Sequence, residues 1–347
     1  MILRFKNVYV KEAATVAGVY ESKGPLSNYF DKKYRKDLYC GEKSFEQAEV
    51  KLLEDSLKLV LKKTNLKEDN IDLVIAGDLL NQITSSCYSS LKMNSPFLGI
   101  YSACATSVEG ILLASSLIEG GFVKNVIAAT SSHNMSSEKQ FRNPTEYGAP
   151  KPKTATFTST GGASILLSDE PSKVKVSEGV IGTMVDYNQK DPLNMGAAMA
   201  GAAAHTLAEY FKESKYKPAD FDLILTGDLG RYGKEILKDF MKEEYKITLG
   251  SNYNDCGTIL YDLDRQKEVM AGGSGPVCSA LVAYSKVLNS LKSIISSNRS
   301  FILTDFCLSK ETNFINSTFS MFGGDLNVFF IFVFVLWNNL FNSRIDT

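Results

Sequence analysis

The sequence predicts an α/β fold made of two duplicated halves, each a mostly parallel sheet covered by helices. The first observation is an amphipathic helix over residues 45–63 followed by the apolar run 72–77, which is typical of a strand buried on both faces. The second is that this unit recurs 150 positions later. Residues 217–229 repeat residues 67–79 with six of thirteen positions identical, which indicates a duplicated domain half and not a solenoid.

The helices of the two halves carry clear sequence signals. Ser44-Phe-Glu-Gln47 matches a capping box, and apolar residues follow it at helical spacing. In the second half, the alanine-rich stretch 197–212 is expected to be the matching helix, and the strand 221–229 follows it. Two such halves pack against each other, so we expect the functional site between them, at the helix N-termini.

Cys104 lies in the stretch 99–118, where an expected strand turns into a helix over residues 106–119. The N-terminus of a helix presents free backbone N–H groups and a partial positive charge, which lower the pKa of a thiol and bind anions. The small neighbours Ala105 and Thr106 allow a ligand to approach closely. The position therefore suits a nucleophile or an anion-binding pocket, and a buried, inert cysteine is the alternative.

A polar cluster follows the next predicted strand, residues 126–130. Ser132, His133 and Asn134 lie where this strand ends, so His133 is expected to donate to a ligand carboxylate or to act as a base for a thiol. A structural histidine is the alternative. The polar, proline-containing stretch 138–158 is interpreted as a long functional loop or as an arm that contacts a partner.

Composition and charge exclude several classes of partner. A net charge of −1 over 347 residues gives no sign of binding to nucleic acid or to an acidic membrane surface. The six cysteines are scattered without Cys-x-x-Cys pairs, which argues against a zinc site or a disulfide framework and suits a reducing cytosol. No carboxylate cluster resembles a calcium loop, and the N-terminal segment lacks the apolar core of a signal peptide. We therefore expect no metal, no cofactor and a cytoplasmic location.

Several segments together are similar to those of a known family. They are Tyr101–Gly110, Ser131–Asn134, Phe141–Gly148, Asn194–Met199, Thr226–Gly230 and Met270–Tyr284. On these segments the chain resembles, over about residues 1–290, the thiolase / ketoacyl-synthase superfamily and, more narrowly, the stage V sporulation protein AD family. The resemblance implies a thiolase-like fold with five-stranded sheets in a layered αβαβα arrangement. Residues 1–170 would form the N-terminal half and residues 171–291 the C-terminal half.

The resemblance is equally informative where the pattern fails. Enzymes of the superfamily use the cysteine as the acyl-accepting nucleophile, and the second half supplies a histidine with a second His or Asn. Here His205 lies within the alanine-rich helix, and neither candidate turn, 226–230 or 252–257, contains a histidine. Asp228 and Asp255 could replace it only if their pKa values were raised strongly. Because proton transfer contributes roughly 10²–10⁴-fold to such reactions, the resemblance implies that the chain is not an enzyme.

The resemblance instead implies a sporulation protein that binds dipicolinic acid, or its calcium complex, for uptake into the developing spore. The partners it implies are the spore membrane channel proteins of the same operon, with the chain peripheral to the spore inner membrane. Dipicolinate is small, planar and doubly anionic, so helix N-terminal amides and polar side chains suit its carboxylates. The expected ligand-binding residues are Cys104, Ala105, Thr106, Ser132, His133, Asn134, Asp228 and Asn254.

Two alternative functions remain open, and a homodimer is expected in each case. The first alternative is an acyltransferase or condensing enzyme that acts from Cys104 with His133 as an unusual base. The second is a structural subunit of a membrane complex with an empty, vestigial pocket. The superfamily implies the dimer, with residues 126–130 pairing across a two-fold axis.

Residues 292–347 depart from the rest of the chain and are rich in Phe, Asn and Ser. The family pattern predicts a further buried strand and a Gly-rich turn after Leu291, which the sequence does not show. The run Val328–Trp337 is ten apolar residues long, whereas a membrane-spanning helix needs about 20. This run could form a buried or aggregation-prone strand or an interfacial anchor. A translated frameshift is favoured over a designed anchor, and the second half is expected to be incomplete and to expose a sheet edge.

Overall fold

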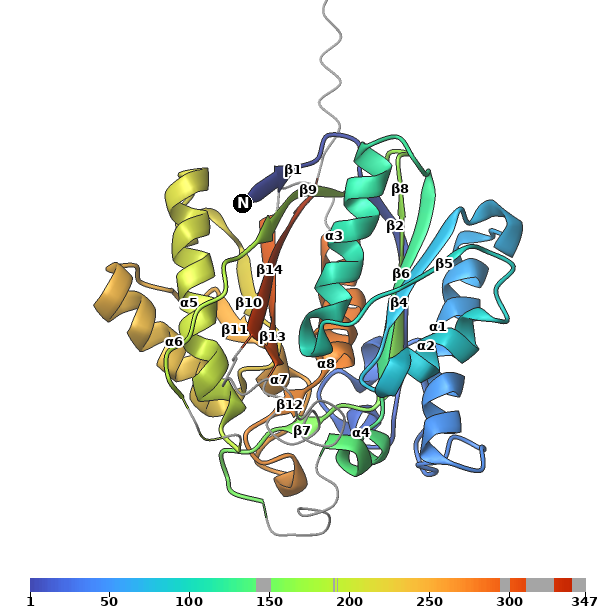
Figure 1. Cartoon of the computed structure of the whole chain (residues 1–347), viewed down its shortest axis with the longest axis horizontal. Coiled ribbons are helices and arrows are strands. Elements are labelled where there is room, and N and C mark those ends of the chain that lie inside the picture. The colour runs from blue at the N-terminus through green and yellow to red at the C-terminus, as the bar shows by residue number, and fades with distance from the viewer. Residues whose placement is uncertain (142–150, 190, 192, 294–299, 310–327, 339–347) are drawn as a thin grey trace, which may run out of the picture.

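The computed structural model describes residues 1–141, 151–189, 191, 193–293, 300–309 and 328–338 (Figure 1). Residues 142–150 of the predicted loop over residues 138–158 lie outside the described residues. The same is true of residues 294–299, 310–327 and 339–347 of the predicted tail.

Helices and strands form five layers, as Figure 1 shows. Two sheet halves face each other across a central layer of helices α3 and α8, α1 and α2 cover the outer face of one half, and α5 and α6 cover the other. This layering confirms the predicted αβαβα arrangement. The helices are α1 (Phe45–Thr64), α2 (Thr84–Ser90), α3 (Thr106–Glu119), α4 (Asn134–Phe141), α5 (Met195–Ser214), α6 (Gly230–Tyr245), α7 (Cys256–Ile259), α8 (Pro276–Val282) and α9 (Leu288–Ser293).

Each half contributes five strands to one continuous sheet path. The first half has the order β5-β4-β6-β8-β2, and the second half repeats it as β11-β10-β13-β14-β9. Four strands of each half run in the same direction, and only β8 and β14 are reversed. These strands are β2 (Tyr9–Ala17), β4 (Leu73–Gly77), β5 (Phe97–Gly99), β6 (Asn125–Ser132), β8 (Gly161–Ser168), β9 (Val174–Ile181), β10 (Leu223–Thr226), β11 (Tyr253–Asp255), β13 (Ser300–Ser309) and β14 (Val328–Asn338).

The duplication is visible in the element boundaries. Helices α1 and α5 each have 20 residues, and their first residues, Phe45 and Met195, are 150 positions apart. Ser44 caps α1 by accepting a hydrogen bond from the Gln47 N–H, as the capping box predicts. The remaining short strands are β1 (Ile2–Arg4), β3 (Lys32–Lys33), β7 (Phe157–Thr158) and β12 (Gly273–Ser274), of which β7 and β12 form a separate two-stranded sheet.

Two strands of the second half come from the predicted tail. β13 pairs in parallel with β10, and β14 pairs antiparallel with both β13 and β9, which is the place that β8 takes in the first half. Phe301, Ile302 and Leu303 of β13 are buried. The predicted boundary at residue 291 and the frameshift remain predictions, but the sheet as described is not left open after residue 291. Among the described residues, none of the helices has both the length and the apolar character needed to cross a bilayer.

The prediction that residues 126–130 pair with a second chain across a two-fold axis is wrong. This segment lies in β6, whose two edges are already hydrogen-bonded to β4 and β8, so no edge is free to pair with a second chain. The strand at the end of the sheet path in the first half is β5. The reason is the strand order, because β5 pairs with the far edge of β4 and so takes the end of the sheet, whereas β6 lies between β4 and β8.

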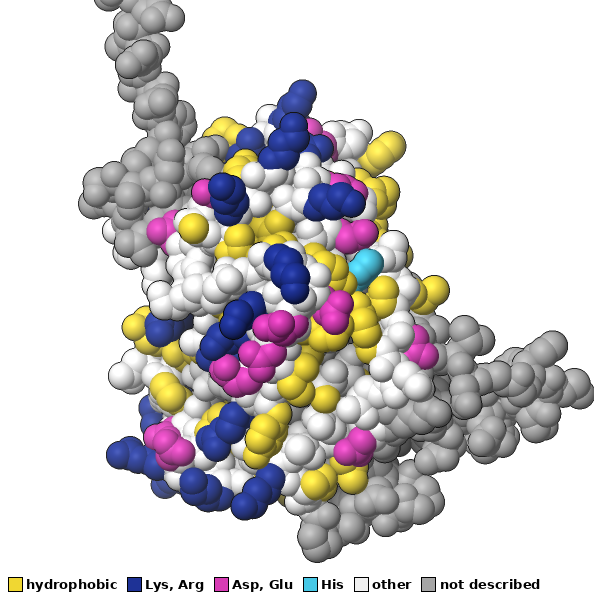
Figure 2. Space-filling view, turned by 90° about the vertical axis from the view of Figure 1, so that its left-hand side faces the viewer, with side chains coloured by type: hydrophobic (Ala, Val, Ile, Leu, Met, Phe, Trp, Pro, Cys, Tyr) yellow, Lys and Arg dark blue, Asp and Glu magenta, His cyan; other side chains and the backbone are white. Residues whose placement is uncertain are grey.

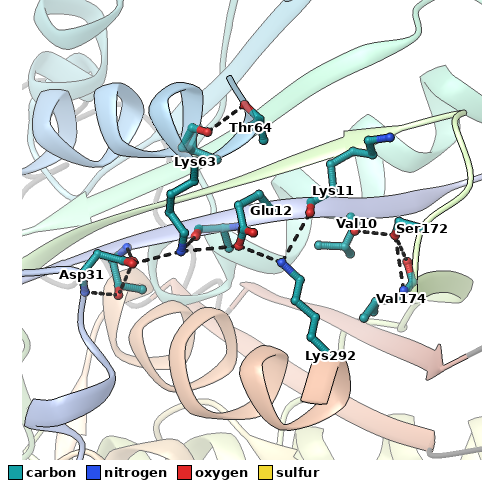
Figure 3. A network of polar contacts seen from close by, with 12 residues as sticks. Val10, Lys11, Glu12, Asp31, Lys63, Thr64, Ser172, Val174 and Lys292 are labelled. Atoms are coloured by element: carbon teal, nitrogen blue, oxygen red, sulfur yellow. Dashed lines mark hydrogen bonds and ion pairs between the residues drawn. The ribbon is translucent and has the colours of Figure 1, made fainter. Parts of the chain in front are cut away.

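Ion pairs and hydrogen bonds join the two halves where β2 meets α9 (Figure 3). Lys292 donates to Glu12 Oε1 at 2.7 Å, and Lys63 lies 3.4 Å from the same oxygen and 3.0 Å from Asp31 Oδ1. Burial alone would raise the pKa of Glu12, but the hydrogen bond from Lys292 and the charges of both lysines hold it below its ordinary value. The network thus fixes the end of α9, in the second half, to β2 of the first half.

The face formed by α5 and α6 carries charges of both signs (Figure 2). Lys and Arg side chains alternate there with Asp and Glu, and apolar side chains lie between them. Such a mixed surface has no single-sign field that would attract a polyanion. This face therefore agrees with the net charge near zero.

Candidate functional site

Cys104 lies at the start of α3, in the central layer between the two halves. A turn of 3₁₀ helix, Ala103–Ala105, leads directly into α3. Ala103 has a φ of +42°, a conformation that residues with a side chain rarely adopt. Thr106 fixes this turn, because its hydroxyl donates to the Ala103 carbonyl at 2.7 Å and accepts the Ser102 N–H at 3.1 Å. The predicted strand-to-helix position of Cys104 is confirmed, and the thiol is buried.

Two polar residues of the second half complete the surroundings of Cys104. Ser274, in β12, lies with its Oγ 3.8 Å from the Cys104 Sγ. The same hydroxyl donates to Asp228 Oδ2 at 2.8 Å, and the Gly275 N–H reaches this oxygen at 3.4 Å. The thiol also interacts with the Asp228 carboxyl. The structure therefore brings together Cys104 and Asp228, which the sequence predicted for one site between the halves.

The Asp228 carboxyl is fully buried, and among the described residues its Oδ1 has no hydrogen-bond partner. Burial raises the pKa of Asp228 above its ordinary value, and the contacts with Cys104, Ser274 and the Gly275 N–H offset this only in part. An unpaired buried oxygen of this kind calls for a functional explanation.

A second buried carboxyl, Asp255, supports the loop that carries Asp228. Its Oδ2 accepts the Leu229 N–H at 2.9 Å and the Thr226 hydroxyl at 2.8 Å, and its Oδ1 accepts the Gly230 N–H at 2.9 Å. Burial, together with the nearby Asp228, raises the pKa of Asp255 to about 7 despite these hydrogen bonds. Asp255 thus holds the backbone between β10 and α6 in place.

Asn254 is not brought to Cys104 by any contact that the structure describes. Its Oδ1 accepts Lys234 Nζ at 2.7 Å and the Asp255 N–H at 2.9 Å, so the amide organises the end of β11. That Asn254 binds ligand stays a prediction. The contacts instead give it a local structural role.

His133 is also turned away from Cys104. Its Nε2 lies 2.8 Å from the Leu38 carbonyl oxygen, and its Nδ1 accepts the Met135 N–H at 3.2 Å. Burial lowers the pKa of His133, so the ring is neutral, with the proton on Nε2. Both nitrogens are therefore occupied within the first half, which favours the structural alternative for this histidine.

Ser132 lies at the edge of the site, and Asn134 begins the neighbouring helix. A Cβ atom built on Gly275 would lie 3.3 Å from Ser132 Oγ, so the hydroxyl borders the glycine whose N–H donates to Asp228. The Asn134 N–H donates to Thr160 Oγ1 at 2.9 Å, while among the described residues its buried Nδ2 has no hydrogen-bond partner.

Comparison with known proteins identifies the family. The family model described as stage V sporulation protein AD matches residues 2–317. The stage V sporulation protein AD of Bacillus subtilis (strain 168) is 45% identical over 285 residues, which are 82% of this chain and 83% of that protein. The chain belongs to the stage V sporulation protein AD family. The family predicted from the sequence is thereby confirmed.

Solved structures of low sequence identity share this fold. The 3-oxoacyl-[acyl-carrier-protein] synthase III of Aquifex aeolicus VF5 is 11% identical, with a TM-score of 0.58 over 96% of this chain and all of that one. Cerulenin-bound OleA of Xanthomonas campestris is 15% identical, with a TM-score of 0.60 over 96% of this chain and 98% of that one. At such identities the likeness shows a common thiolase-like fold, as predicted.

Ser274 is the residue of the site that sequence reasoning missed. It lies in Gly272-Gly-Ser-Gly275, a segment that supported the family resemblance but was given no chemical role. Gly272 and Gly275 have φ values of +139° and +89°, which favour glycine, and a Cβ atom on Gly272 would lie 2.9 Å from the Gly257 carbonyl oxygen. A serine enclosed by such glycines just before a proline-initiated helix was the signal available.

Among the described residues, no three His, Cys, Asp or Glu side chains gather as metal ligands.

Proposed function

We propose that this sporulation protein binds dipicolinic acid and is not an enzyme. The observation that carries the proposal is that the second half presents Asp228 and Ser274 to Cys104, where an acyl-transferring enzyme of this fold would need a histidine. A buried carboxyl and a hydroxyl can position a ligand, and both ring nitrogens of His133, the alternative base, are already hydrogen-bonded within the first half. Family membership supports the sporulation role.

The chemistry of the site suits a small dianion. Cys104 lies just before α3, and the partial positive charge at the N-terminus of this helix favours a carboxylate nearby. The Ala105 and Thr106 N–H groups themselves donate to the Ser102 and Ala103 carbonyls. The hydroxyl groups of Ser132 and Ser274 border this region, where they donate to the Ser159 carbonyl and to Asp228 Oδ2, respectively. A planar ligand with two carboxylates could contact both halves at once.

Calorimetric titration with dipicolinate, with and without calcium, tests the proposal, and benzoate and acetyl-coenzyme A serve as comparison ligands. We expect saturable binding of dipicolinate, weaker binding of the monoanion benzoate, and no signal from acetyl-coenzyme A. Cys104→Ala should weaken dipicolinate binding only modestly, whereas Cys104→Trp should abolish it by filling the site. No dipicolinate binding by the folded wild-type protein would contradict the proposal.

The second candidate function is acyl transfer from Cys104. The position of Cys104 at the start of a helix favours it, because such positions activate thiols. Alkylation followed by peptide mapping discriminates between the two functions. Labelling of Cys104 far above the other five cysteines, or an acyl adduct formed from a thioester donor, would favour the enzyme.

For its assembly, we propose a homodimer and a peripheral place on the spore inner membrane beside channel proteins encoded in the same operon. The strand β5 supports the dimer, since Phe97 and Leu98 are 36% and 41% exposed at the end of the sheet path. Tyr88 and Leu91 of the adjoining α2 region are also exposed. Sedimentation of the wild type and of Leu98→Lys tests this, and we expect the variant to be monomeric.

A further inference from the structure

The two carboxyl oxygens of Asp228 differ in their hydrogen bonding. Oδ2 accepts the Ser274 hydroxyl at 2.8 Å and the Gly275 N–H at 3.4 Å, whereas Oδ1 has no partner among the described residues. The whole side chain is 0% exposed. An ionised carboxylate would leave a charged oxygen unpaired in the interior, which is costly.

The groups that face Asp228 provide no positive charge. They are the thiol of Cys104 from the start of α3, the carboxyl of Asp255 from β11 and the thiol of Cys278 from α8. Among the described residues, neither a lysine nor an arginine forms an ion pair with Asp228. A proton on the carboxyl removes the charge and turns the unpaired oxygen into a hydrogen-bond donor.

We propose that Asp228 binds the ligand as a protonated carboxylic acid whose O–H donates to a ligand carboxylate, so that anion binding is coupled to protonation of Asp228. This inference rests on the proposed function, because it assigns a donor to the same site. No covalent step is involved. One proton stays on, or is taken up by, the Asp228 carboxyl when the ligand binds.

Electrostatics requires this coupling if the ligand carboxylate approaches Asp228. Two ionised carboxylates in contact repel each other strongly in a buried site, whereas an acid–carboxylate hydrogen bond is among the strongest that proteins form. The geometry also gives specificity. A ligand carboxylate accepts this O–H in a charge-assisted hydrogen bond and is favoured by the partial positive charge at the start of α3, whereas a neutral carbonyl is a weaker acceptor for the same O–H.

The test is titration of the protein with sodium dipicolinate from pH 6 to 9, without calcium, in two buffers of different ionisation enthalpy. Both ligand carboxylates are ionised throughout this range, so a change in affinity reports on the protein. We expect the affinity to fall about tenfold per pH unit above the pKa of Asp228, with uptake of one proton per bound ligand. In Asp228→Asn, whose amide donates without titrating, the affinity should be independent of pH. Glu21→Gln, which removes another buried carboxyl, is the matched control and should keep the wild-type pH dependence.

The outcomes separate this inference from the proposed function. Wild-type affinity that does not change with pH, or an Asp228→Asn protein that keeps the wild-type slope, would overturn the coupling while leaving dipicolinate binding intact. No binding by the wild type at any pH would overturn the proposed function and the coupling with it. Infrared difference spectra keep the inference falsifiable if the variant does not fold, because ligand binding at high pH must then generate a protonated carboxyl band in the wild type.

Discussion

Asp78 and Asp228 hold the same position in the two halves, 150 residues apart, yet their carboxyl groups have different partners. Asp78 Oδ1 accepts the Leu80 N–H at 2.8 Å, and its Oδ2 accepts both the N–H and the hydroxyl of Ser86 at 2.7 Å. In the described part of the chain, Asp228 makes no such bonds to the helix that follows it and faces Cys104 instead. In the first half the carboxyl holds α2, and in the second half it belongs to the site.

The second half can release Asp228 because another residue holds the following helix. Asp255 accepts the Leu229 and Gly230 N–H groups at the start of α6, which is the task that Asp78 performs at α2. The pKa values of Asp78 and Asp228 are both raised by burial, but of the two only Asp228 has an oxygen left for a ligand. A duplicated fold thus acquires a site when one copy transfers a structural role to a new side chain.

The largest expected effect tests whether β13 completes the second half as β6 completes the first. Ile127 in β6 pairs with Val74, and Ile302 in β13 pairs with Ile224, so the two isoleucines are equivalent and both are fully buried. Ile127→Ala and Ile302→Ala should each lower the free energy of unfolding by about 2–5 kcal/mol. Urea denaturation monitored by circular dichroism measures these free energies of unfolding. A neutral Ile302→Ala beside a costly Ile127→Ala would mean that the strand from the tail is not part of the folded core.

An intermediate effect is expected from removing the two aspartates. Asp78→Ala leaves three buried donors, the Leu80 N–H and both groups of Ser86, without an acceptor, and should lower the free energy of unfolding by about 1–3 kcal/mol. Asp228→Ala frees the Ser274 hydroxyl and one weakly bonded N–H, so its cost at pH 7 should be smaller. Thermal and urea denaturation of both variants give the ranking. An equal or larger cost for Asp228→Ala would contradict the division of roles between the halves.

Much of the fold could be predicted because the duplication and the hydrophobic periodicity are local signals. The repeat at 67–79 and 217–229 predicted the halves, and small residues around Cys104 predicted the strand-to-helix turn. The orientation of His133 could not be predicted, because the Leu38 carbonyl that accepts its proton is 95 residues away. The place of β14 between β13 and β9 could not be predicted either, because a run of apolar residues does not specify which strands it will pair with.

The smallest expected effect concerns two contacts that join the halves, one through a protonated carboxyl and one through an ion pair. The Tyr261 hydroxyl of the second half donates to buried Glu21, which also accepts the Thr160 N–H at 2.9 Å. Burial raises the pKa of Glu21 to about 7 in spite of these bonds, whereas Glu12, paired with Lys292, has a lowered pKa.

The signs of the two pH dependences therefore differ. Between pH 4.5 and 7 the native state holds a proton on Glu21 that the unfolded chain has already released, so this group makes the free energy of unfolding fall as the pH rises across that range. Glu21→Gln removes this contribution, so between pH 5 and 7 the free energy of unfolding should fall less with rising pH, by up to about 1.4 kcal/mol per pH unit. Glu12→Gln, the matched control, should lower stability without changing that slope, because Glu12 is ionised in both states there. Urea denaturation across this range decides the matter, and an unchanged slope in Glu21→Gln would mean that Glu21 is ionised in the native protein.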